Sequence, residues 1–541
     1  MPEHVELTWR GAAARRKPQP PTSSDGSRDR IAAVPPESSP DTPPRRQGMF
    51  AVLAAVACTV FGAKLVVISA LGSSMPLKDQ WDGEAANLYA PYLKGELSLA
   101  DLVAPHNQHR ILCSRLLTLM HLELGGEWNP RLEMILGAGV HTALITYLAA
   151  LLMPLVAPRL RMLLACFTAL LFAVPIGYEN TLWGFQSPVY FTLLFGVAAL
   201  AAFARAHPFS LRWFGGLTAA VLSYFSFGTG VATLLGGGML LGVQVIAGAR
   251  ERRVREYAAI VVVLAFAAVA ILDLATAKPN STPVTFIEGL LLLTFSIIVA
   301  LIPALWYCRY TLTRRPAIGD RAWVFIGIVA WIAIQLALVA YGRGAVVAVR
   351  YMDIILLLYP LALVAVLEFV RESDMTRFGR LARAGTVMWV FTVVAAVSFL
   401  GYYASLLGAM EWSRSAGQEL VNVRAYLATK DADHLRGRGG GNGKFDLAYP
   451  DPQRLAALLG DSDVRAILPH ALRPADADNR AARSRMLLKG KFDGATSAAV
   501  NGLFSLGPAL LGLGLSLFFA AGTRGSLLKT AVGRLDSPPT S

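Results

Sequence analysis

Long apolar segments recur along the whole chain and limit its fold more than any other feature. A helix of about 20 apolar residues is long enough to cross a bilayer. The 541 residues are 55% hydrophobic and only 16% charged, which exceeds what a soluble core of this length buries. We predict an all-α polytopic membrane protein with about 12 transmembrane helices, at residues 49–72, 131–155, 162–177, 188–204, 213–227, 230–249, 257–276, 286–308, 322–341, 352–370, 386–408 and 500–522.

The pair 213–227 and 230–249 is separated by "FGTG" and is also compatible with a re-entrant hairpin that does not cross the membrane. Losing both segments would preserve the orientation of everything that follows them.

Arginine is distributed unevenly between the loops. The loops at 156–162, 205–212, 249–257, 309–321 and 371–385 contain sixteen arginines, whereas the alternate short loops contain three basic residues. Short basic loops stay in the cytoplasm, so we expect both termini to be cytoplasmic. The net charge of +14 then reflects topology and does not indicate a nucleic-acid partner. The abundance of Ala, Gly and Arg, without a eukaryotic targeting signal, favours a bacterial inner membrane.

This topology predicts two long segments outside the membrane, at 73–130 and 409–499. We expect a disordered cytoplasmic tail at 1–48, a multi-span domain at 49–408, a small extracytoplasmic C-terminal segment at 409–499, a last helix at 500–522 and a cytoplasmic tail at 523–541. Within the C-terminal segment, "GRGGGNGKF" lacks the order of a phosphate loop and is typical of a flexible linker. The four cysteines show no paired or metal-binding spacing.

The first polar patch predicted outside the membrane is "KDQWDGE", which contains Asp79, Trp81 and Asp82. A carboxylate beside the membrane surface can deprotonate an acceptor hydroxyl or hold a divalent cation. The two aspartates also stand where a helix N-cap and its third-position partner would stand. Both interpretations remain open from this stretch alone.

The second patch is "PHNQHRIL", with His106, Asn107, His109 and Arg110. Two histidines without a third ligand are a weak zinc signal. A helix that starts after Pro105 would direct free backbone N–H groups toward a phosphate or sugar, and these side chains would add further donors. A solvated helix start is the alternative.

The third patch, "YENTLWGFQ", contains Glu179, Asn180, Trp183 and Gln186. Amide side chains beside aromatic rings suit a sugar, whose hydroxyls bond to amides and whose C–H faces stack on rings. The aromatic residues alone are also typical of a membrane-interface belt.

The fourth patch, "YGRGAVVAVRYMD", contains Arg343, Arg350 and Tyr351. Its two arginines run against the positive-inside bias of the chain, so they need an explanation. A guanidinium matches the oxygens of a lipid phosphate, whereas snorkelling to headgroups is the simpler reading.

Together the stretches "DQW", "HNQHR", "YENTLWGFQ" and "RY" resemble a group of bacterial GT-C-like membrane proteins. GT-C glycosyltransferases are multi-span enzymes that take a sugar from a polyprenyl-phosphate carrier. The resemblance covers residues 49–408 in layout and rests on these four motifs at residue level. It implies a polyprenyl-phosphate sugar donor, a glycan or lipid acceptor, and contacts with membrane lipids.

The resemblance also implies roles for individual residues. Asp79 would be the catalytic base, with Asp82 as the competing candidate. The phosphate of the donor would be surrounded by His109, Arg110, Arg343 and Arg350, and the sugar by Glu179, Asn180 and Gln186. Trp81, His106, Asn107, Trp183 and Tyr351 complete the expected substrate-binding set. The family differs in its use of Mg²⁺ or Mn²⁺, and "DQWD" has no adjacent carboxylates, so no cofactor is assigned.

Two other classes of protein remain compatible with the sequence. A transporter or flippase of lipid-linked glycans would need ionisable residues inside the membrane, for which Lys64, His141, Asp273 and Glu288 are candidates. A polysaccharide polymerase or ligase would also use arginines on the outer side.

Overall fold

The computed structural model describes residues 44–275, 281–374, 377–437 and 446–535. Contacts within the chain group Arg45–Ser541 into one compact unit. Residues 1–43 of the predicted tail, most of the predicted linker (438–445) and residues 536–541 lie outside the described residues. Residues 44–48, which we predicted to be disordered, belong to a helix that starts at Pro44.

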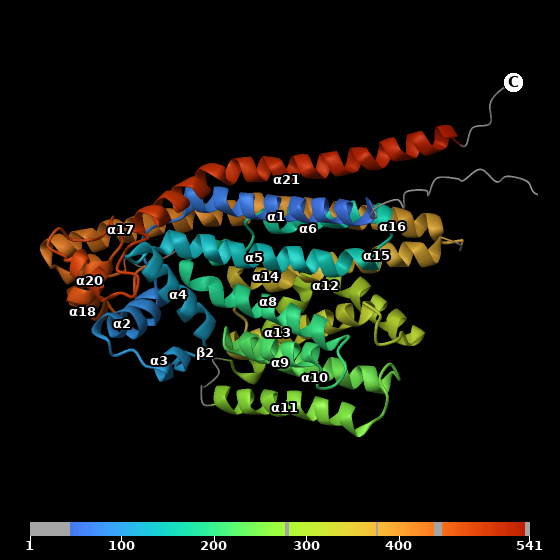
Figure 1. The fold of residues 1–541 in the computed structure, drawn as a ribbon, viewed down its shortest axis with the longest axis horizontal. Helices are drawn as coiled ribbons and strands as arrows, with labels where there is room; N and C mark the ends of the chain where they lie inside the picture. The colour runs from blue at the N-terminus through green and yellow to red at the C-terminus, as the bar shows by residue number, and fades with distance from the viewer. Residues whose placement is uncertain (1–43, 276–280, 375–376, 438–445, 536–541) are drawn as a thin grey trace, which may run out of the picture. The chain divides into compact units, whose positions relative to one another are not determined.

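Long helices that run side by side form most of the described structure (Figure 1). The longer helices of this bundle are α1 (Pro44–Leu71), α5 (Pro130–Leu152), α6 (Arg161–Ala173), α8 (Ser187–Phe203), α9 (Leu211–Tyr224), α10 (Val231–Ile246), α11 (Val254–Leu274), α12 (Pro283–Arg314), α13 (Ala322–Arg343), α15 (Leu358–Ser373), α16 (Gly379–Leu400), α17 (Leu407–Thr429) and α21 (Asp493–Leu535).

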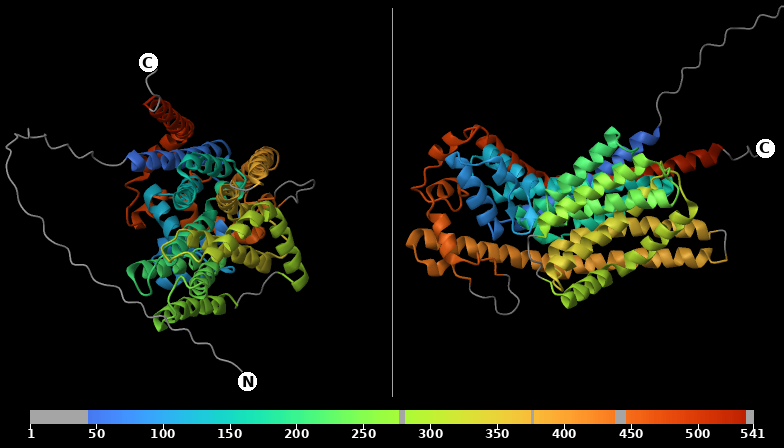
Figure 2. Two further views of the ribbon diagram at one scale, coloured as in Figure 1. Left: turned by 90° about the vertical axis from the view of Figure 1, so that its right-hand side faces the viewer. Right: turned by 90° about the horizontal axis from the view of Figure 1, so that it is seen from below.

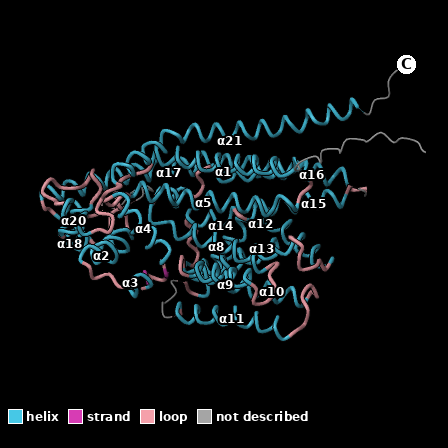
Figure 3. The backbone as a smooth tube through the Cα atoms, viewed as in Figure 1, coloured by secondary structure: helices cyan, strands magenta, loops and turns pink. Residues whose placement is uncertain are grey.

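Shorter elements connect these helices. They are α2 (Ala90–Lys94), α3 (Leu99–Val103), α4 (Leu112–Gly125), α7 (Tyr178–Leu182), α14 (Met352–Leu356), α18 (Pro452–Gly460), α19 (Ser462–Ile467), α20 (Asn479–Arg485), the π-helices η1 (Trp81–Tyr89) and η7 (Gly401–Leu406), and the 3-10 turns η2 (Met153–Leu155), η3 (Pro158–Leu160), η4 (Gly184–Gln186), η5 (Gly228–Gly230), η6 (Val349–Tyr351) and η8 (Ala432–Leu435). Two-residue strands β1 (Pro105–His106) and β2 (His109–Arg110) form the one sheet in the described residues (Figure 3).

The prediction of an all-α polytopic membrane protein is confirmed in its coarse form. Ten helices among the described residues are long and apolar enough to cross a membrane. The predicted segments 162–177 and 213–227 correspond to α6 and α9, which have only 13 and 14 residues. The count of twelve spans therefore stays a prediction. The segment 230–249, which we paired with 213–227 as uncertain, is one of the ten as Gly228–Ile246.

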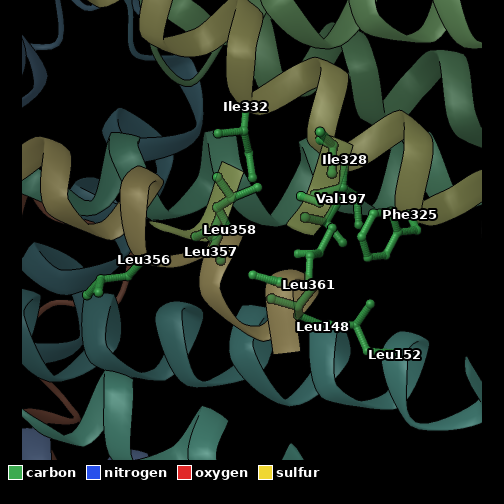
Figure 4. Packing of buried hydrophobic residues seen from close by; sticks show 14 of the residues in the cluster. Leu148, Leu152, Val197, Phe325, Ile328, Ile332, Leu356, Leu357, Leu358 and Leu361 are labelled. Carbon is green, nitrogen blue, oxygen red and sulfur yellow. The ribbon is translucent and has the colours of Figure 1, made fainter. Parts of the chain in front are cut away.

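The main core of the bundle is made of aliphatic side chains and tryptophans from helices that are far apart in the sequence. Leu148 and Leu152 of α5, Val197 of α8 and Phe325 and Ile328 of α13 pack around the leucines of α14 and α15 (Figure 4). Close packing of this kind keeps the ends of these helices at fixed relative positions. The loops that they carry are held accordingly.

The segments 73–129 and 430–492 meet at one end of the bundle, which we call the loop face (Figures 1 and 2). A second hydrophobic core joins them, and it includes Trp81 and Trp128 from the first segment and Leu455 and Ile467 from the second. The helix of the predicted span 386–408 continues through η7 and α17 to Thr429 and adds Trp412 to this core. The C-terminal segment is therefore packed onto the first loop.

Arg-rich loops meet at the opposite end of the same helices. Arg205 and Arg321 line one small cavity there. Arg371 donates a 2.6 Å hydrogen bond to Glu368, whose carboxylate also lies 3.9 Å from Arg314. The arginines that predict the cytoplasmic side thus come from separate loops and gather together.

Glu123 of α4 is a suitable residue for testing the attachment of the C-terminal segment. Its buried carboxylate accepts hydrogen bonds from the backbone N–H groups of Leu487 (3.2 Å) and Leu488 (2.6 Å). We expect Glu123→Ala to weaken docking by about 2–3 kcal/mol, because two amides lose their acceptor. Limited proteolysis in detergent should then cut within 430–492 faster than in the wild type.

The matched control is Glu411→Ala, since Glu411 forms only a surface ion pair of 3.5 Å with Arg414 among the described residues. Such pairs contribute about 0–1 kcal/mol. Equal cleavage rates in the two variants would contradict the role given to Glu123.

Candidate functional site

The two aspartates of the first patch have different surroundings. Asp82 accepts a 2.6 Å hydrogen bond from Nε of Arg454 and another from the hydroxyl of Tyr449, both in the C-terminal segment. Asp79 is half-buried and makes no hydrogen bond or ion pair with a described residue. Asp82 thus ties the C-terminal segment to the first loop, and Asp79 retains a free carboxylate.

Neither aspartate caps the helix that follows. The N-cap residue of η1 is Gln80, whose side chain makes no capping hydrogen bond and instead accepts a 3.0 Å hydrogen bond from the preceding Leu77 N–H. The capping interpretation of Asp79 and Asp82 is therefore wrong. The turn is sharpened by Lys78, which has a positive φ of 47°.

A buried polar cluster supports this turn from below. The amide of Gln80 donates to Glu84 (3.1 Å) and to Glu133 of α5 (2.9 Å), and the indole of Trp128 donates to Glu84 (2.9 Å). Burial and the neighbouring Glu133 raise the pKa of Glu84 well above its usual range, which favours its protonated form. Asp79 thus sits directly on a rigid support.

Trp81 belongs to this support and not to a substrate surface. Its side chain is only 1% exposed, and its ring packs edge-on against Trp128 at 5.1 Å between centroids. The resemblance placed Trp81 at the substrate, whereas the structure places it in the core of the loop face.

A β-hairpin, and not a helix, follows Pro105, so our expectation of a helix start there is wrong. Strands β1 and β2 pair His106 with His109 around a two-residue turn, in which Asn107 has a positive φ of 50°. Asn tolerates this conformation better than most residues, which suits a tight turn. Directly opposed residues project to the same side of a hairpin, so the two histidines share one face.

His106 faces the aspartate turn. Its ring lies edge-on to Phe185 at 5.3 Å, and a Cβ on Gly83 would lie within 3.3 Å of it. Burial lowers the pKa of His106, whereas the carboxylate of Asp79 acts in the opposite direction. His106 is therefore close to Asp79. The amide of its neighbour Asn107 lies 3.4 Å from the ring nitrogen Nε2.

His109 contacts the residues that lead into α10. Its Nδ1 accepts a 3.2 Å hydrogen bond from the Gly228 N–H, and its ring stacks on Phe227 at 4.1 Å. Burial and the guanidinium of Arg343 lower the pKa of His109 to about 3. At neutral pH the imidazole is uncharged, and with Nδ1 accepting, its proton lies on Nε2. His109 is thus a fixed hydrogen-bond donor.

A cavity of about 350 Å³ opens beside His109. At one end it has the polar side chains of Gln108, His109, Thr229 and Arg343, together with Tyr351. Its remaining walls are apolar and come from α10, α11 and α13, and they include Leu235, Ile271, Leu274, Leu338 and Val339. Ile271 is exposed on the outer surface of α11, so the lining reaches the surface that faces lipid in a bilayer. A polar head with an apolar tail would match this lining.

Arg110 is committed elsewhere in this structure. Its guanidinium bonds to both carboxylate oxygens of Asp273 at the end of α11 (2.9 and 2.5 Å) and to the Val103 carbonyl (2.7 Å). The resemblance assigned Arg110 to the donor phosphate, but this ion pair occupies it. Asp273, which we considered as an intramembrane charge of a transporter, is the partner of Arg110 in this ion pair.

Asn180 has a structural role in the third patch. Its amide donates to the Arg350 carbonyl (2.8 Å) and to the Asp353 carboxylate (2.7 Å). Trp183 is buried, and its indole donates to the Leu77 carbonyl at 3.2 Å. These bonds bring the first, third and fourth patches together. Gln186 is buried at the end of η4.

Glu179 differs from its neighbours because it faces the polar site. Burial raises its pKa, whereas Arg350 and Lys78 act in the opposite direction. Lys78 also lies over the ring of Trp412, 5.6 Å from its centroid. Sequence reasoning missed Lys78, since its partners Glu179 and Trp412 are distant in the chain.

The two arginines of the fourth patch retain free guanidinium groups. Arg343 and Arg350 form no ion pair with any described residue, although Arg350 lies 5.6 Å from the ring centroid of Tyr351. Both are close enough to His109 to lower its pKa. The site therefore combines two unpaired arginines with the unpaired carboxylate of Asp79.

No group of three or more His, Cys, Asp or Glu side chains is placed to hold a metal among the residues that the structure describes. Asp82 is taken up by Arg454, and Nδ1 of His109 by Gly228. The positive charge at the site comes from Lys78, Arg343 and Arg350.

Comparison with known proteins leaves this geometry as the main guide to function. No family model matches the sequence, and no match is found among curated proteins or solved structures.

The neutral state of His109 can be tested through the pH dependence of stability. The pKa of His109 is about 3 in the folded chain, whereas an unperturbed histidine, as in the unfolded chain, has a pKa of 6.5. Between pH 3 and pH 6.5 the unfolded chain therefore binds a proton that the folded chain does not. Stability is therefore fully present above pH 6.5 and falls as the pH drops toward 3. His109→Gln keeps an acceptor for Gly228 and removes the titration. We expect its melting temperature to fall less than that of the wild type between pH 6.5 and about 4.5. Parallel curves would show that His109 is not held neutral.

Proposed function

We propose that this protein is a GT-C-type glycosyltransferase. It would move a sugar from a polyprenyl-phosphate carrier to a cell-envelope glycan or lipid acceptor on the outer face of a bacterial inner membrane. The supporting observation is that the free carboxylate of Asp79 lies close to His106, and an apolar cavity lined by Arg343 opens beside His109, the neighbouring histidine of the same hairpin. The proposal includes a GT-C fold of about twelve spans with both termini in the cytoplasm.

The donor would occupy the cavity with its phosphate at the polar end. Arg343 and Arg350 supply unpaired guanidinium groups, which match phosphate oxygens in two-point geometry. The Nε2–H of His109 adds one neutral donor. The apolar walls of α10, α11 and α13 would hold the first isoprene units of the lipid chain, because its hydrocarbon is shielded from water there.

The acceptor would approach from the side of Asp79. Asp79 takes the proton of the acceptor hydroxyl while that oxygen bonds to the anomeric carbon of the sugar. The bond between this carbon and the phosphate oxygen breaks, and the polyprenyl phosphate leaves with the electron pair. Arg343 and Arg350 stabilise the negative charge that develops on the leaving phosphate. Glu179, held between Lys78 and Arg350, is placed to accept hydrogen bonds from sugar hydroxyls.

A second candidate, a transporter or flippase of lipid-linked glycans, rests on a different observation. Charged and polar side chains are buried together inside the bundle, where Lys64 of α1 donates to Thr181 (2.9 Å) and His141 of α5 lies 3.7 Å from Asp353. Tyr190 stacks on His141 at 4.3 Å. Buried ionisable groups of this kind mark proton or ion paths in many transporters. A polymerase or ligase would use the same arginines.

Sugar transfer by the purified full-length protein tests the enzyme proposal. The assay supplies radiolabelled polyprenyl-phosphate sugars and a native lipid extract as acceptor. We expect Asp79→Asn to lower the rate by at least about 10²-fold, because it removes the base. Asp82→Asn should lose less than about tenfold, since it weakens a half-exposed ion pair with Arg454 while its amide oxygen can still accept the hydrogen bond of Tyr449.

Donor binding and elution as a single folded species serve as controls in both variants. Arg343→Gln should instead raise the KM for the donor. Loss of activity in Asp82→Asn with full activity in Asp79→Asn would reverse the two assignments. Absence of turnover across a broad donor panel would count against the enzyme.

Transport can be measured independently in proteoliposomes that contain fluorescent lipid-linked sugars. A flippase that uses the buried pair should lose transbilayer movement in Asp353→Asn and Lys64→Met, with Asp79→Asn unaffected. Movement that is absent in the wild type would remove this second candidate.

A further inference from the structure

Helix α4 presents an unusual surface for a segment outside the ten candidate spans. Every residue of α4 that is exposed or half-buried is apolar: Leu112, Cys113, Leu116, Leu117, Leu119, Met120 and Leu124. Leu116 is 50% exposed and Met120 is 42% exposed. The buried residues include most of its polar side chains, namely Ser114, Arg115, Thr118, His121 and Glu123. A helix covered by water on its outer face would show the reverse pattern.

Three polar side chains of α4, those of Ser114, Arg115 and Glu123, point inward to hydrogen-bond partners. Arg115 donates to the carbonyls of Asp101 (2.9 Å), Leu102 (3.0 Å) and Ala104 (2.6 Å), and so caps the end of α3. Glu123 holds the C-terminal segment, as described above. Hydrogen bonds of these polar side chains therefore fix the orientation of α4. Its apolar side faces outward and contacts the surroundings of the protein.

The position of α4 identifies its surroundings. Near its start, Ser114 accepts a 3.0 Å hydrogen bond from Ser187 at the beginning of α8, and Cys113 lies 3.9 Å from the Leu222 carbonyl of α9. At its end, the Leu124 carbonyl accepts a 2.8 Å hydrogen bond from Thr496 at the beginning of α21. A 14-residue helix is about 21 Å long. It thus lies beside the beginnings of α8 and α21, which belong to two of the helices long and apolar enough to cross a membrane (Figure 1).

Helix α3 extends the same surface. Leu99 is 82% exposed, and Val103 is also exposed. The Val103 carbonyl is held by Arg110, which in turn pairs with Asp273 of α11, and the neighbouring Leu272 of α11 is exposed as well. The exposed side chains of α3 and α4 are therefore continuous with the outer face of a membrane-spanning helix.

We propose that Leu99, Val103, Leu116 and Met120, the α3–α4 surface, lie in the hydrocarbon of the leaflet at the loop face. Burial of large aliphatic side chains in lipid is favourable, and interfacial helices bind membranes through such a face. The partner of this surface is lipid acyl chains. The surface ends at the β-hairpin beside the cavity, so molecules that diffuse in this leaflet would meet the cavity along α4. This assignment does not depend on the proposed enzymatic activity.

Spin-label accessibility tests this placement directly. In a variant with Cys58, Cys113, Cys166 and Cys308 replaced by Ala, a nitroxide is attached at Leu116→Cys or Met120→Cys in the full chain, in nanodiscs. Collisions with O₂, which concentrates in hydrocarbon, are compared with collisions with the water-soluble chelate NiEDDA. Phe295→Cys on α12 provides the lipid-facing reference, and Val421→Cys on α17 provides the aqueous one. Both parent side chains are exposed.

We expect the O₂-to-NiEDDA ratio at Leu116 and Met120 to exceed that at Val421 several-fold and to approach that at Phe295. A ratio equal to that at Val421 would place the surface in water and overturn the proposal. Low accessibility to both reagents, with an immobilised spectrum, would instead indicate a contact between two copies of the chain, which also contradicts it. Each variant is first checked for a single folded species by size exclusion, and Leu99→Cys on α3 provides an independent second site.

Discussion

The convergence of the polar patches depends above all on the buried amide of Asn180. Its two hydrogen bonds, to the Arg350 carbonyl and to Asp353, join α7 to η6 and α14 across 170 residues of sequence. The carboxylate of Asp353 approaches α7 so closely that a Cβ on Gly177 would lie 2.5 Å from its Oδ2. Only glycine leaves that space. Since Lys64 and His141 surround the same carboxylate, the position of Arg350 is set inside the bundle and not by the loop that carries it.

The opposite side of the site is set in a comparable way by Gln80. One amide bonds to two buried carboxylates, Glu84 from η1 and Glu133 from α5, and thereby fixes the turn that carries Asp79 to a membrane-spanning helix. Gly184 allows this arrangement, because a Cβ there would lie 2.5 Å from Glu133. Buried polar groups are costly unless each is satisfied, so these clusters favour one geometry strongly over its alternatives. A residue that must take a proton in a defined direction benefits from such support.

The sequence predicts the parts of this structure that depend on local pattern. Apolar runs place the helices of the bundle, and the arginine distribution groups the loops that meet near Arg205 and Arg321. The sequence also identifies the four polar patches that lie together at the loop face. The misplaced residues are those whose partners lie far away in the chain: Arg110 with Asp273, Asp82 with Arg454, and Trp81 with Trp128. Single charged or aromatic residues carry no signal of such pairing, because the pairing follows from tertiary packing. The reversed face of α4 escaped notice for the same reason, since it depends on the carbonyls that Arg115 finds in α3.

The charges that remain without partners after folding are therefore the most informative ones. Arg110, Arg115, Arg250, Arg454 and Arg473 all bond to carboxylates or carbonyls of the chain itself. Arg343 and Arg350 form no ion pair with any described residue, although the short loops alternating with the Arg-rich ones contain only one other basic residue. Repulsion between two such groups and the nearby Lys78 raises the free energy of the empty site, and a bound anion would relieve it. Asp79 forms no ion pair with these cations among the described residues, although Lys78 precedes it in the chain and interacts with it electrostatically. An unpaired carboxylate near unpaired cations is suited to taking up a proton while a negative charge develops close to the cations.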